Sequence, residues 1–349
     1  MSIVINPFGY AALTEAVNKM LPVPTFIRNL LFKKVVTSAT KTVMTDVIVG
    51  GQKIAPFVNR GEPAKVVGNL GSQAQTVEPP NIRLKKFLKP SDLFYDRGPG
   101  APIFVPGGPA GADPIRQAQL KKIADEQKDL RDIIDRSIEM MCAKGLAGSY
   151  QIVQDNVAFK IDFQMPAANK PVLEGDAKWD VAAKCTPLKN IRLWKVQVQK
   201  LTGKIPTIAI MSSATWEAFI AADEVTKYLD KLKINIGLIA SDPSVLDAGA
   251  EKKATIENVT IYTYDGVYVN EAGAQTQMIP NGYVSLVSPA ADNRLQFAGI
   301  EDLDAGTTVG QFFSKDWVEK DPSGLNLLVE SHPLPTFNEP GTMIYAKVY

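Results

Sequence analysis

Apolar residues between positions 114 and 145 recur at helical spacing and predict one long helix. The stretch reads "PIRQAQLKKIADEQKDLRDIIDRSIEMMCAKG". Proline suits the first turn of a helix and glycine commonly ends one, in agreement with Pro114 and Gly145. Spacings of four and seven residues place the larger apolar side chains in a single stripe: Ile123, Leu130, Ile134 and Met141. We expect a helix of about eight turns that packs on one side only.

The other positions of this helix are mostly charged, and opposite charges lie four residues apart, where they can meet on a helix surface. Lys128 and Asp132 have this spacing, as do Arg131 and Asp135. Asp135 and Glu139 also form an acid pair that could hold a cation, but they alternate with basic residues. The pattern therefore favours a solvated, ion-paired face over a metal site.

Residues 33–90 form a long excursion with the pattern of extended chain. From Val35 to Val49, ten of fifteen residues are Val, Ile or Thr, whose branching at Cβ favours strands over helices. Glycines interrupt the pattern at Gly50 and Gly51, and few large apolar residues follow before Lys89. The excursion resembles a long hairpin with too little apolar mass for a core of its own.

An arm precedes the excursion. In "YAALTEAVNKML", Leu13, Val17 and Leu21 are four residues apart and predict a short helix with one apolar side. Prolines at positions 22 and 24 end this pattern.

Residues 179–296 have the pattern of a compact mixed α/β unit. "KIPTIAIM" reads as a buried strand, and Ser212 or Ser213 can cap the helix that follows. Asp265-Gly266 and Asn281-Gly282 are dipeptides that favour hairpin turns, so a hairpin is expected at each.

Composition narrows the class of protein. The 349 residues, of which 45% are apolar and 21% charged, suit a soluble globular chain of about two domains. The net charge of +1 indicates no general attraction to nucleic acid or membranes. Cys142 and Cys185 match neither a disulfide framework nor a metal-ligand spacing. The sequence has no secretion signal and no apolar run of membrane-spanning length, so a cytosolic site of synthesis is expected.

The charge of the excursion is one-sided. Residues 33–90 carry ten basic and only three acidic side chains. Two interpretations are open: a solvated basic face, or a surface that meets acidic side chains of another chain.

No enzymatic motif is evident. The single histidine, His332, rules out sites with two histidine ligands, and no GxSxG sequence accompanies it. The glycine-rich stretches lack the spacing of a dinucleotide fingerprint or a P-loop. Nucleic-acid-binding motifs are also absent from the sequence. We expect neither catalysis nor a cofactor.

Five stretches, taken in order, carry a resemblance to a known family. They are "PTFIRNLLFKK" (24–34), "GGQKIAPFVNRGEPAKVV" (50–67), the long charged helix, "GIEDLDA" (299–305) and "KDWVEKDPSGLNLLVESHPLP" (315–335). Their order resembles tailed-phage major capsid proteins of the Hong Kong 97 type, and most closely the lambda-type major capsid protein E family.

The resemblance implies an α+β Hong Kong 97 type capsid fold with six successive parts. These are an N-arm (1–32), an E-loop that is an extended β ribbon (33–90), a peripheral domain with a spine helix near 114–145 (91–178), an axial domain (179–296), a return to the peripheral domain (297–335) and a terminal strand in the axial domain (336–349). The implied function is that of a major capsid (head) protein of a tailed bacteriophage.

The resemblance also implies partners. Copies of the chain would assemble into pentamers and hexamers of an icosahedral shell, in the virion, around packaged double-stranded DNA bound without sequence specificity. A scaffolding protein, a portal and a decoration protein are the other expected partners, and no membrane is involved. The sequence starts directly at the arm without a long charged leader, so scaffolding is expected from a separate protein.

The tip of the excursion, residues 49–68, is where contacts between subunits are expected. A two-stranded ribbon is marginal alone in water, and its unpaired edges invite pairing. A neighbouring subunit should therefore cover it. The expected contact residues are Lys53, Phe57, Arg60, Glu62 and Lys65.

Two alternatives remain open on the sequence alone. An encapsulin-like nanocompartment shell protein would share the fold but enclose cargo enzymes. A soluble α/β enzyme with an unusual site would need a ligand-sized apolar pocket with convergent polar groups.

Overall fold

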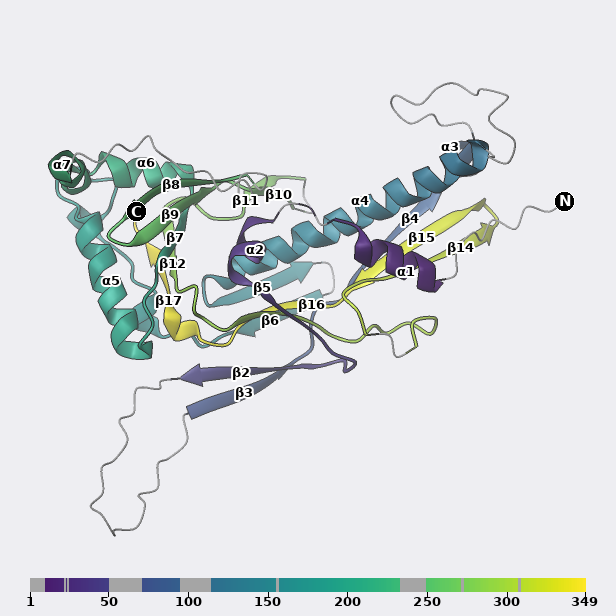
Figure 1. Ribbon diagram of the computed structural model, residues 1–349, viewed down its shortest axis with the longest axis horizontal. Helices are drawn as coiled ribbons and strands as arrows, with labels where there is room; N and C mark the ends of the chain where they lie inside the picture. The colour runs from purple at the N-terminus through teal and green to yellow at the C-terminus, as the bar shows by residue number, and fades with distance from the viewer. Residues whose placement is uncertain are drawn as a thin grey trace, which may run out of the picture.

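A computed structural model describes most of the chain, and one long helix organises it (Figure 1). The described residues are 10–21, 23, 25–49, 71–94, 114–154, 157–232, 249–270, 273–306 and 309–349. Helix α4 (Pro114–Gly145) runs along the molecule, with a five-stranded sheet beyond its C-terminal end (Figure 1).

The apolar stripe of α4 is buried. Ile123, Leu130, Ile134 and Met141 are each 3% exposed or less. Helix α4 contacts strand β16 (Pro333–Phe337) and two strands of a three-stranded antiparallel sheet, which runs beneath the helix (Figure 1). Its strands, in spatial order, are β14 (Phe313–Lys320), β15 (Ser323–Ser331) and β4 (Ile82–Leu88).

Shorter elements complete the body around α4. Helix α1 (Tyr10–Lys19) contacts β14, and α2 (Phe26–Leu31) and α3 (Pro90–Phe94) contact α4. After α4 ends at Gly145, β5 (Ser149–Gln154) and β6 (Val157–Asp162) form a separate antiparallel pair.

The second body is a mixed five-stranded sheet in the order β17-β12-β7-β9-β8. The strands are β7 (Ile208–Met211), β8 (Ala250–Ile256), β9 (Val259–Tyr264), β12 (Tyr283–Val287) and β17 (Met343–Lys347). Strands β7 and β9 are parallel, and the other neighbours are antiparallel. Every residue of β7 is buried, as its unbroken apolar sequence predicts.

Helices cover this sheet. They are α5 (Pro187–Thr202), α6 (Ser213–Ala221) and α7 (Asp223–Leu232). The Ser212 side chain accepts a hydrogen bond from the Thr215 backbone N–H, so the expected cap of α6 is confirmed. Short 3₁₀ turns lie at Ala167–Asn169, Gly175–Ala177 and Pro340–Thr342.

A third sheet joins distant parts of the chain. Strand β1 (Lys34–Thr37) runs parallel to β13 (Asn293–Phe297), which pairs antiparallel with β16 (Pro333–Phe337). Because β13 lies in this sheet, the segment 179–296 contributes to the five-stranded sheet only as far as β12, and β17 joins that sheet from residues 343–347. Only part of the 33–90 excursion is ribbon in the described residues, because β1 and β4 belong to other sheets.

That ribbon consists of β2 (Val43–Val49) and β3 (Gly71–Val77), which pair only with each other. It lies below the rest of the molecule in Figure 1, and β2 contacts the turn Pro340–Thr342. At its base Val43 and Val77 are buried, whereas the Met44 side chain is 66% exposed.

Three local expectations were wrong. Leu21 does not share the buried side of α1, since it is 84% exposed while Leu13 and Val17 are buried. Neither expected hairpin forms, because β10 (Val267–Val269) pairs with β11 (Gln275–Gln277) and not with β9. Asn281-Gly282 likewise links β11 to β12, which are not paired.

Candidate assembly surfaces

The side of α4 that faces the N-terminal arm is polar and buried. Arg131, Asp135 and Glu139, one helical turn apart, are each 4% exposed or less. The expectation of a solvated charged face, and of a helix packed on one side only, is therefore wrong at these three positions. Each of them contacts a specific group of the arm.

Arg131 binds the C-terminal end of α1. Its Nη1 donates hydrogen bonds to the carbonyl oxygen of Val17, at 2.5 Å, and to that of Met20. The last carbonyls of a helix have no partners within it and carry partial negative charge, which a guanidinium satisfies. Burial lowers the pKa of Arg131, although the nearby Asp135 carboxylate opposes that shift.

Glu139 binds the N-terminal end of α2. Its carboxylate accepts hydrogen bonds from the backbone N–H groups of Ile27, at 2.7 Å, and Arg28, at 3.0 Å. These are first-turn donors, and a carboxylate there also complements the helix dipole. Burial raises the pKa of Glu139, and the two backbone hydrogen bonds reduce that rise.

Asp135 lies between them and pairs with the arm directly. The Arg28 Nη1 donates to its Oδ1 at 2.6 Å, and the Arg131 Nε lies 3.5 Å from its Oδ2. One carboxylate thus faces two guanidinium groups in a buried site. The arm is held to α4 by apolar contacts and by two charged side chains of α4: Arg131 at the C-terminal end of α1 and Glu139 at the N-terminal end of α2.

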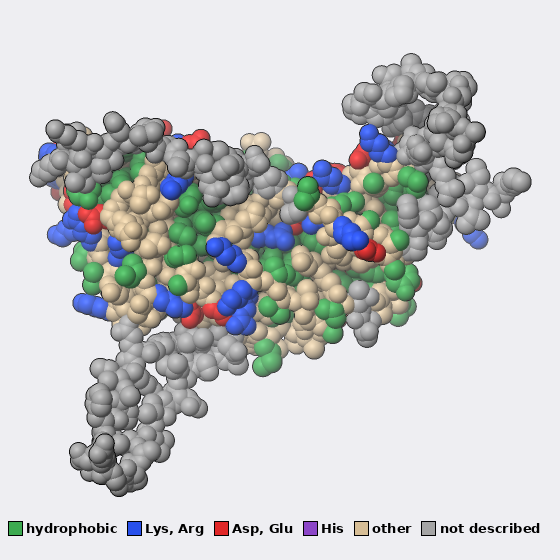
Figure 2. All heavy atoms as spheres, in the orientation of Figure 1, with side chains coloured by type: hydrophobic (Ala, Val, Ile, Leu, Met, Phe, Trp, Pro, Cys, Tyr) green, Lys and Arg blue, Asp and Glu red, His purple; other side chains and the backbone are tan. Residues whose placement is uncertain are grey.

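The basic side chains of the excursion that the structure describes mostly find carboxylates within the same chain. Four pairs are present: Lys34–Asp292 at 2.6 Å, Lys41–Glu78 at 3.0 Å, Arg83–Asp302 at 2.8 Å and Lys86–Glu126 at 2.7 Å. These four basic residues therefore have acidic partners without a contribution from another chain. In Figure 2, basic side chains are scattered over the visible face and do not form one patch.

Three of these acidic partners have a lowered pKa: Glu126, to which Lys86 donates, and the pair Asp292 and Asp302. Burial would raise the pKa of Asp292, but hydrogen bonds from Arg294, Lys34 and Asn338 lower it overall. The pKa of Asp302 is also lowered overall, because Lys315 donates a hydrogen bond to its carboxylate, although burial opposes this shift. Both carboxylates are thereby kept charged, and they hold β1 and β4 to neighbouring segments.

The expected contact residues at the ribbon tip lie outside the described residues. This applies to Lys53, Phe57, Arg60, Glu62 and Lys65, so their role stays a prediction. Met44 of the ribbon presents an exposed apolar side chain.

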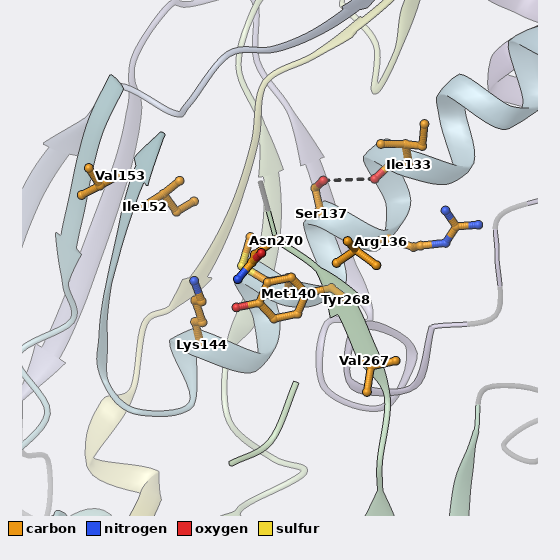
Figure 3. Close-up of a pocket in the computed structure, with 11 residues that line it drawn as sticks. Ile133, Arg136, Ser137, Met140, Lys144, Ile152, Val153, Val267, Tyr268 and Asn270 are labelled. Carbon is orange, nitrogen blue, oxygen red and sulfur yellow. Dashed lines mark hydrogen bonds between the residues drawn. The ribbon is translucent and has the colours of Figure 1, made fainter. Parts of the chain in front are cut away.

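A groove of about 720 Å³ lies between helix α4, strand β5 and strand β10 (Figure 3). Helix α4 and strand β5 line one side of it and strand β10 the other. Ile133, Val153, Val267 and Val269 on these walls are 37–64% exposed. Sequence patterns could not reveal this groove, because it combines three segments that are far apart in the chain.

The charged side chains that line this groove are basic. Its lining holds two basic side chains, Arg136 and Lys144, and no carboxylate. The Lys144 Nζ lies 5.7 Å from the centre of the Tyr268 ring, in a cation–π contact across the groove.

His332, the other residue considered for catalysis, is buried and lies against a buried glutamate. It is 6% exposed, and its Nε2 lies 3.1 Å from Oε1 of the buried Glu330. The other oxygen of Glu330 is 3.3 Å from the Arg83 Nε. Within the described residues, no group of three or more His, Cys, Asp or Glu side chains could hold a metal ion. No helix in the described ranges has the length and apolar character to cross a membrane.

Comparison with known proteins identifies the family. The model of the phage major capsid protein E family matches residues 9–348. The P21 prophage-derived major head protein of Escherichia coli CFT073 is 23% identical over 332 residues, which cover 91% of this chain and 92% of that protein. The major capsid protein of Enterobacteria phage P21 matches equally well.

Solved structures agree on the fold. A prophage capsid protein from Escherichia coli CFT073 superposes with a TM-score of 0.69 at 16% identity, over 97% of both chains. A phage-related protein from Bordetella bronchiseptica RB50 gives 0.55 at 12% identity, over 97% of this chain and 96% of the other. The expected Hong Kong 97 type capsid fold is confirmed, and the chain belongs to the phage major capsid protein E family.

Proposed function

We propose that copies of this chain form the pentamers and hexamers of an icosahedral phage head that encloses packaged double-stranded DNA. Membership of the family makes the chain a structural protein of the virion. The mode of assembly is our inference, and the exposed ribbon β2–β3 is the observation that carries it.

The ribbon needs a partner for physical reasons. Two strands alone are marginally stable in water, and each has an outer edge of unpaired backbone groups. In the described residues β2 and β3 form a sheet with no third strand, and the base of this sheet is anchored at buried Val43, Thr45 and Val77, where β2 contacts the turn Pro340–Thr342. A neighbouring copy that packs on the ribbon would bury Met44 and satisfy one edge.

Repetition of that contact would generate a ring. If the ribbon docks on a different part of the neighbouring copy, the contact is head-to-tail, and such contacts form a ring when the rotation between copies closes. Obligate interfaces bury on the order of 2,000–5,000 Å². Burial at about 25 cal/mol per Å² of apolar surface then holds a shell without any catalytic step.

Each body would have its own place in the shell. The five-stranded sheet with α5, α6 and α7 would serve as the axial domain, around the symmetry axes of the rings. Helix α4 with β4, β14 and β15 would form the peripheral domain. A scaffolding protein, a portal and a decoration protein are further proposed partners, together with DNA contacted without regard to sequence.

The test is assembly of the purified chain, followed by electron microscopy and sedimentation. Wild type should form rings, shells or tubes. Met44→Glu should lose assembly because it places a charge where apolar burial is expected, whereas Met44→Leu should retain it. Thermal unfolding of both variants should match wild type, since Met44 is exposed in the single chain. A wild-type chain that stays monomeric at high concentration, with or without a scaffold, would contradict the proposal.

A further inference from the structure

Leu303 is a fully exposed apolar side chain on a turn that is attached to the body at both ends. Its exposure is 102%. The Ala305 N–H closes this turn by donating a hydrogen bond to the carbonyl oxygen of Asp302, at 3.0 Å. Ile300 and Ala305, on either side of Leu303, are buried in the same apolar cluster. We call residues 300–305 the Leu303 turn.

Ion pairs fix the same turn. Lys315 of β14 donates to the carboxylates of Asp302 and Asp304, each at 2.8 Å. Arg83 of β4 donates to the other oxygen of Asp302, also at 2.8 Å. A single exposed leucine is common on protein surfaces and by itself indicates no contact. A leucine on a fixed turn differs, because little conformational freedom remains to be lost when it binds a partner.

The groove between α4, β5 and β10 offers a surface that suits such a side chain (Figure 3). Ile133 of α4 is 37% exposed and Val153 of β5 is 63% exposed, so both would gain from leaving water. Arg136 and Lys144 line the same groove and are eight residues apart, which corresponds to about 12 Å along the helix axis. The groove therefore presents apolar surface together with two positive charges.

The Leu303 turn carries the opposite charge. Glu301 lies two residues before Leu303 and Asp304 directly follows it. Their side chains are 52% and 58% exposed, although each has a basic neighbour within the chain. Carboxylates that are this exposed remain accessible to a second cation. The turn and the groove are thus complementary in charge and in apolar character, and the fully exposed Leu303 does not reach the groove of its own chain.

We propose that the Leu303 turn of one copy docks into the groove of a second copy. Leu303 lies against Ile133 and Val153, and the acidic side chains beside it face the two basic side chains of the groove. Because the turn and the groove are different surfaces, the contact is heterologous and can repeat from copy to copy. In a phage head, which rests on the proposed function, this contact joins subunits independently of the β2–β3 ribbon.

The test is site-specific cross-linking of the full-length chain. Leu303→Cys and Val153→Cys are prepared separately, mixed as single subunits, concentrated and mildly oxidised. The natural cysteines give little background, since Cys142 is 0% and Cys185 2% exposed. A disulfide between positions 303 and 153, located by mass spectrometry, should form several-fold faster than one between Leu303→Cys and Leu193→Cys. Leu193 is the matched control, because on α5 its exposure of 57% is close to that of Val153.

Charge exchange gives a second measurement, one that general loosening of the chain does not imitate. Arg136→Glu and Glu301→Arg, each introduced into both preparations, place like charges opposite each other and should slow the cross-link several-fold. Chains that carry both changes have opposite charges in contact again and should recover the wild-type rate. Thermal unfolding of the variants should match wild type, because the substituted side chains are on the surface.

The outcomes separate this proposal from the proposed function. Rings or shells that form without the link between positions 303 and 153 would overturn the docking of the turn and leave the proposed function standing. The specific link in chains that form no rings would support the docking while the proposed function fails. A rate no faster than the control, a link from position 303 to another surface, or a charge-exchanged chain that does not recover would each overturn the docking.

Discussion

The buried ion pair between the arm and α4 predicts an unequal response to loss of its two partners. Asp135 is fully buried and faces both Arg28, at 2.6 Å, and Arg131, at 3.5 Å. Asp135→Leu leaves two guanidinium groups without their carboxylate. Arg28→Met leaves Asp135 with Arg131 as a remaining partner.

The magnitudes follow from what stays unpaired. Removal of one partner from a buried pair costs about 3–5 kcal/mol, because an uncompensated charge remains, and we expect Asp135→Leu to lie in this range. Arg28→Met should cost less, about 1.5–3 kcal/mol, the contribution of a hydrogen bond to a charged group. The double variant should cost less than the two losses added together, by about 0.5–3 kcal/mol.

Guanidinium denaturation of the single subunit, followed by fluorescence of the four tryptophans, measures the free energy of unfolding. Hydrogen exchange at the amides of Ile27 and Arg28 reports release of the arm separately. Both variants should accelerate that exchange. The reasoning is refuted if Arg28→Met destabilises the chain as much as Asp135→Leu, or if the two effects simply add.

Two further predictions concern the core and the pH dependence. Ile134→Ala should cost about 2–5 kcal/mol of unfolding free energy, because Ile134 is fully buried. Ile133→Ala should cost well under half of that, because Ile133 is 37% exposed. Equal losses of the two variants in denaturant titration would contradict the assignment of the stripe. The folded-state pKa of Asp292 lies below 3.8, so its contribution to stability is present above that pH and is lost as the pH falls through the folded value. The gap in unfolding free energy between wild type and Asp292→Asn should therefore narrow as the pH falls below 3.8, and a gap that widens on acidification would show that the sign is wrong.

Local signals were sufficient for much of the fold. Residues 114–145 form the expected helix because periodicity and end signals agree, and β7 is the expected buried strand. The Asp265-Gly266 signal failed because β9 pairs with β7 and β8 instead. The actual hairpin between β8 and β9 turns at Glu257 and Asn258, with φ of 53° and 61°. These residues tolerate the left-handed region less readily than glycine, so the turn gave no strong signal.

The surfaces were harder to predict than the elements. Arg131, Asp135 and Glu139 have the same four-residue spacing as many solvated ion pairs, and only the arm that packs on them reveals their burial. Lys34 and Arg83 find their carboxylates more than 200 residues away in sequence, a distance at which no local pattern gives information. The contact residues expected at the ribbon tip remain a prediction.

The pairing of β17 with β12 has a consequence for the timing of biosynthesis. Met343–Lys347 is made after every other described strand, yet it completes one side of the five-stranded sheet. The β1–β13 ladder likewise waits for residues made some 260 positions later. A nascent polypeptide that has not yet reached Lys347 thus lacks one strand of the five-stranded sheet, so this sheet should become complete only after residues 343–347 have been synthesised.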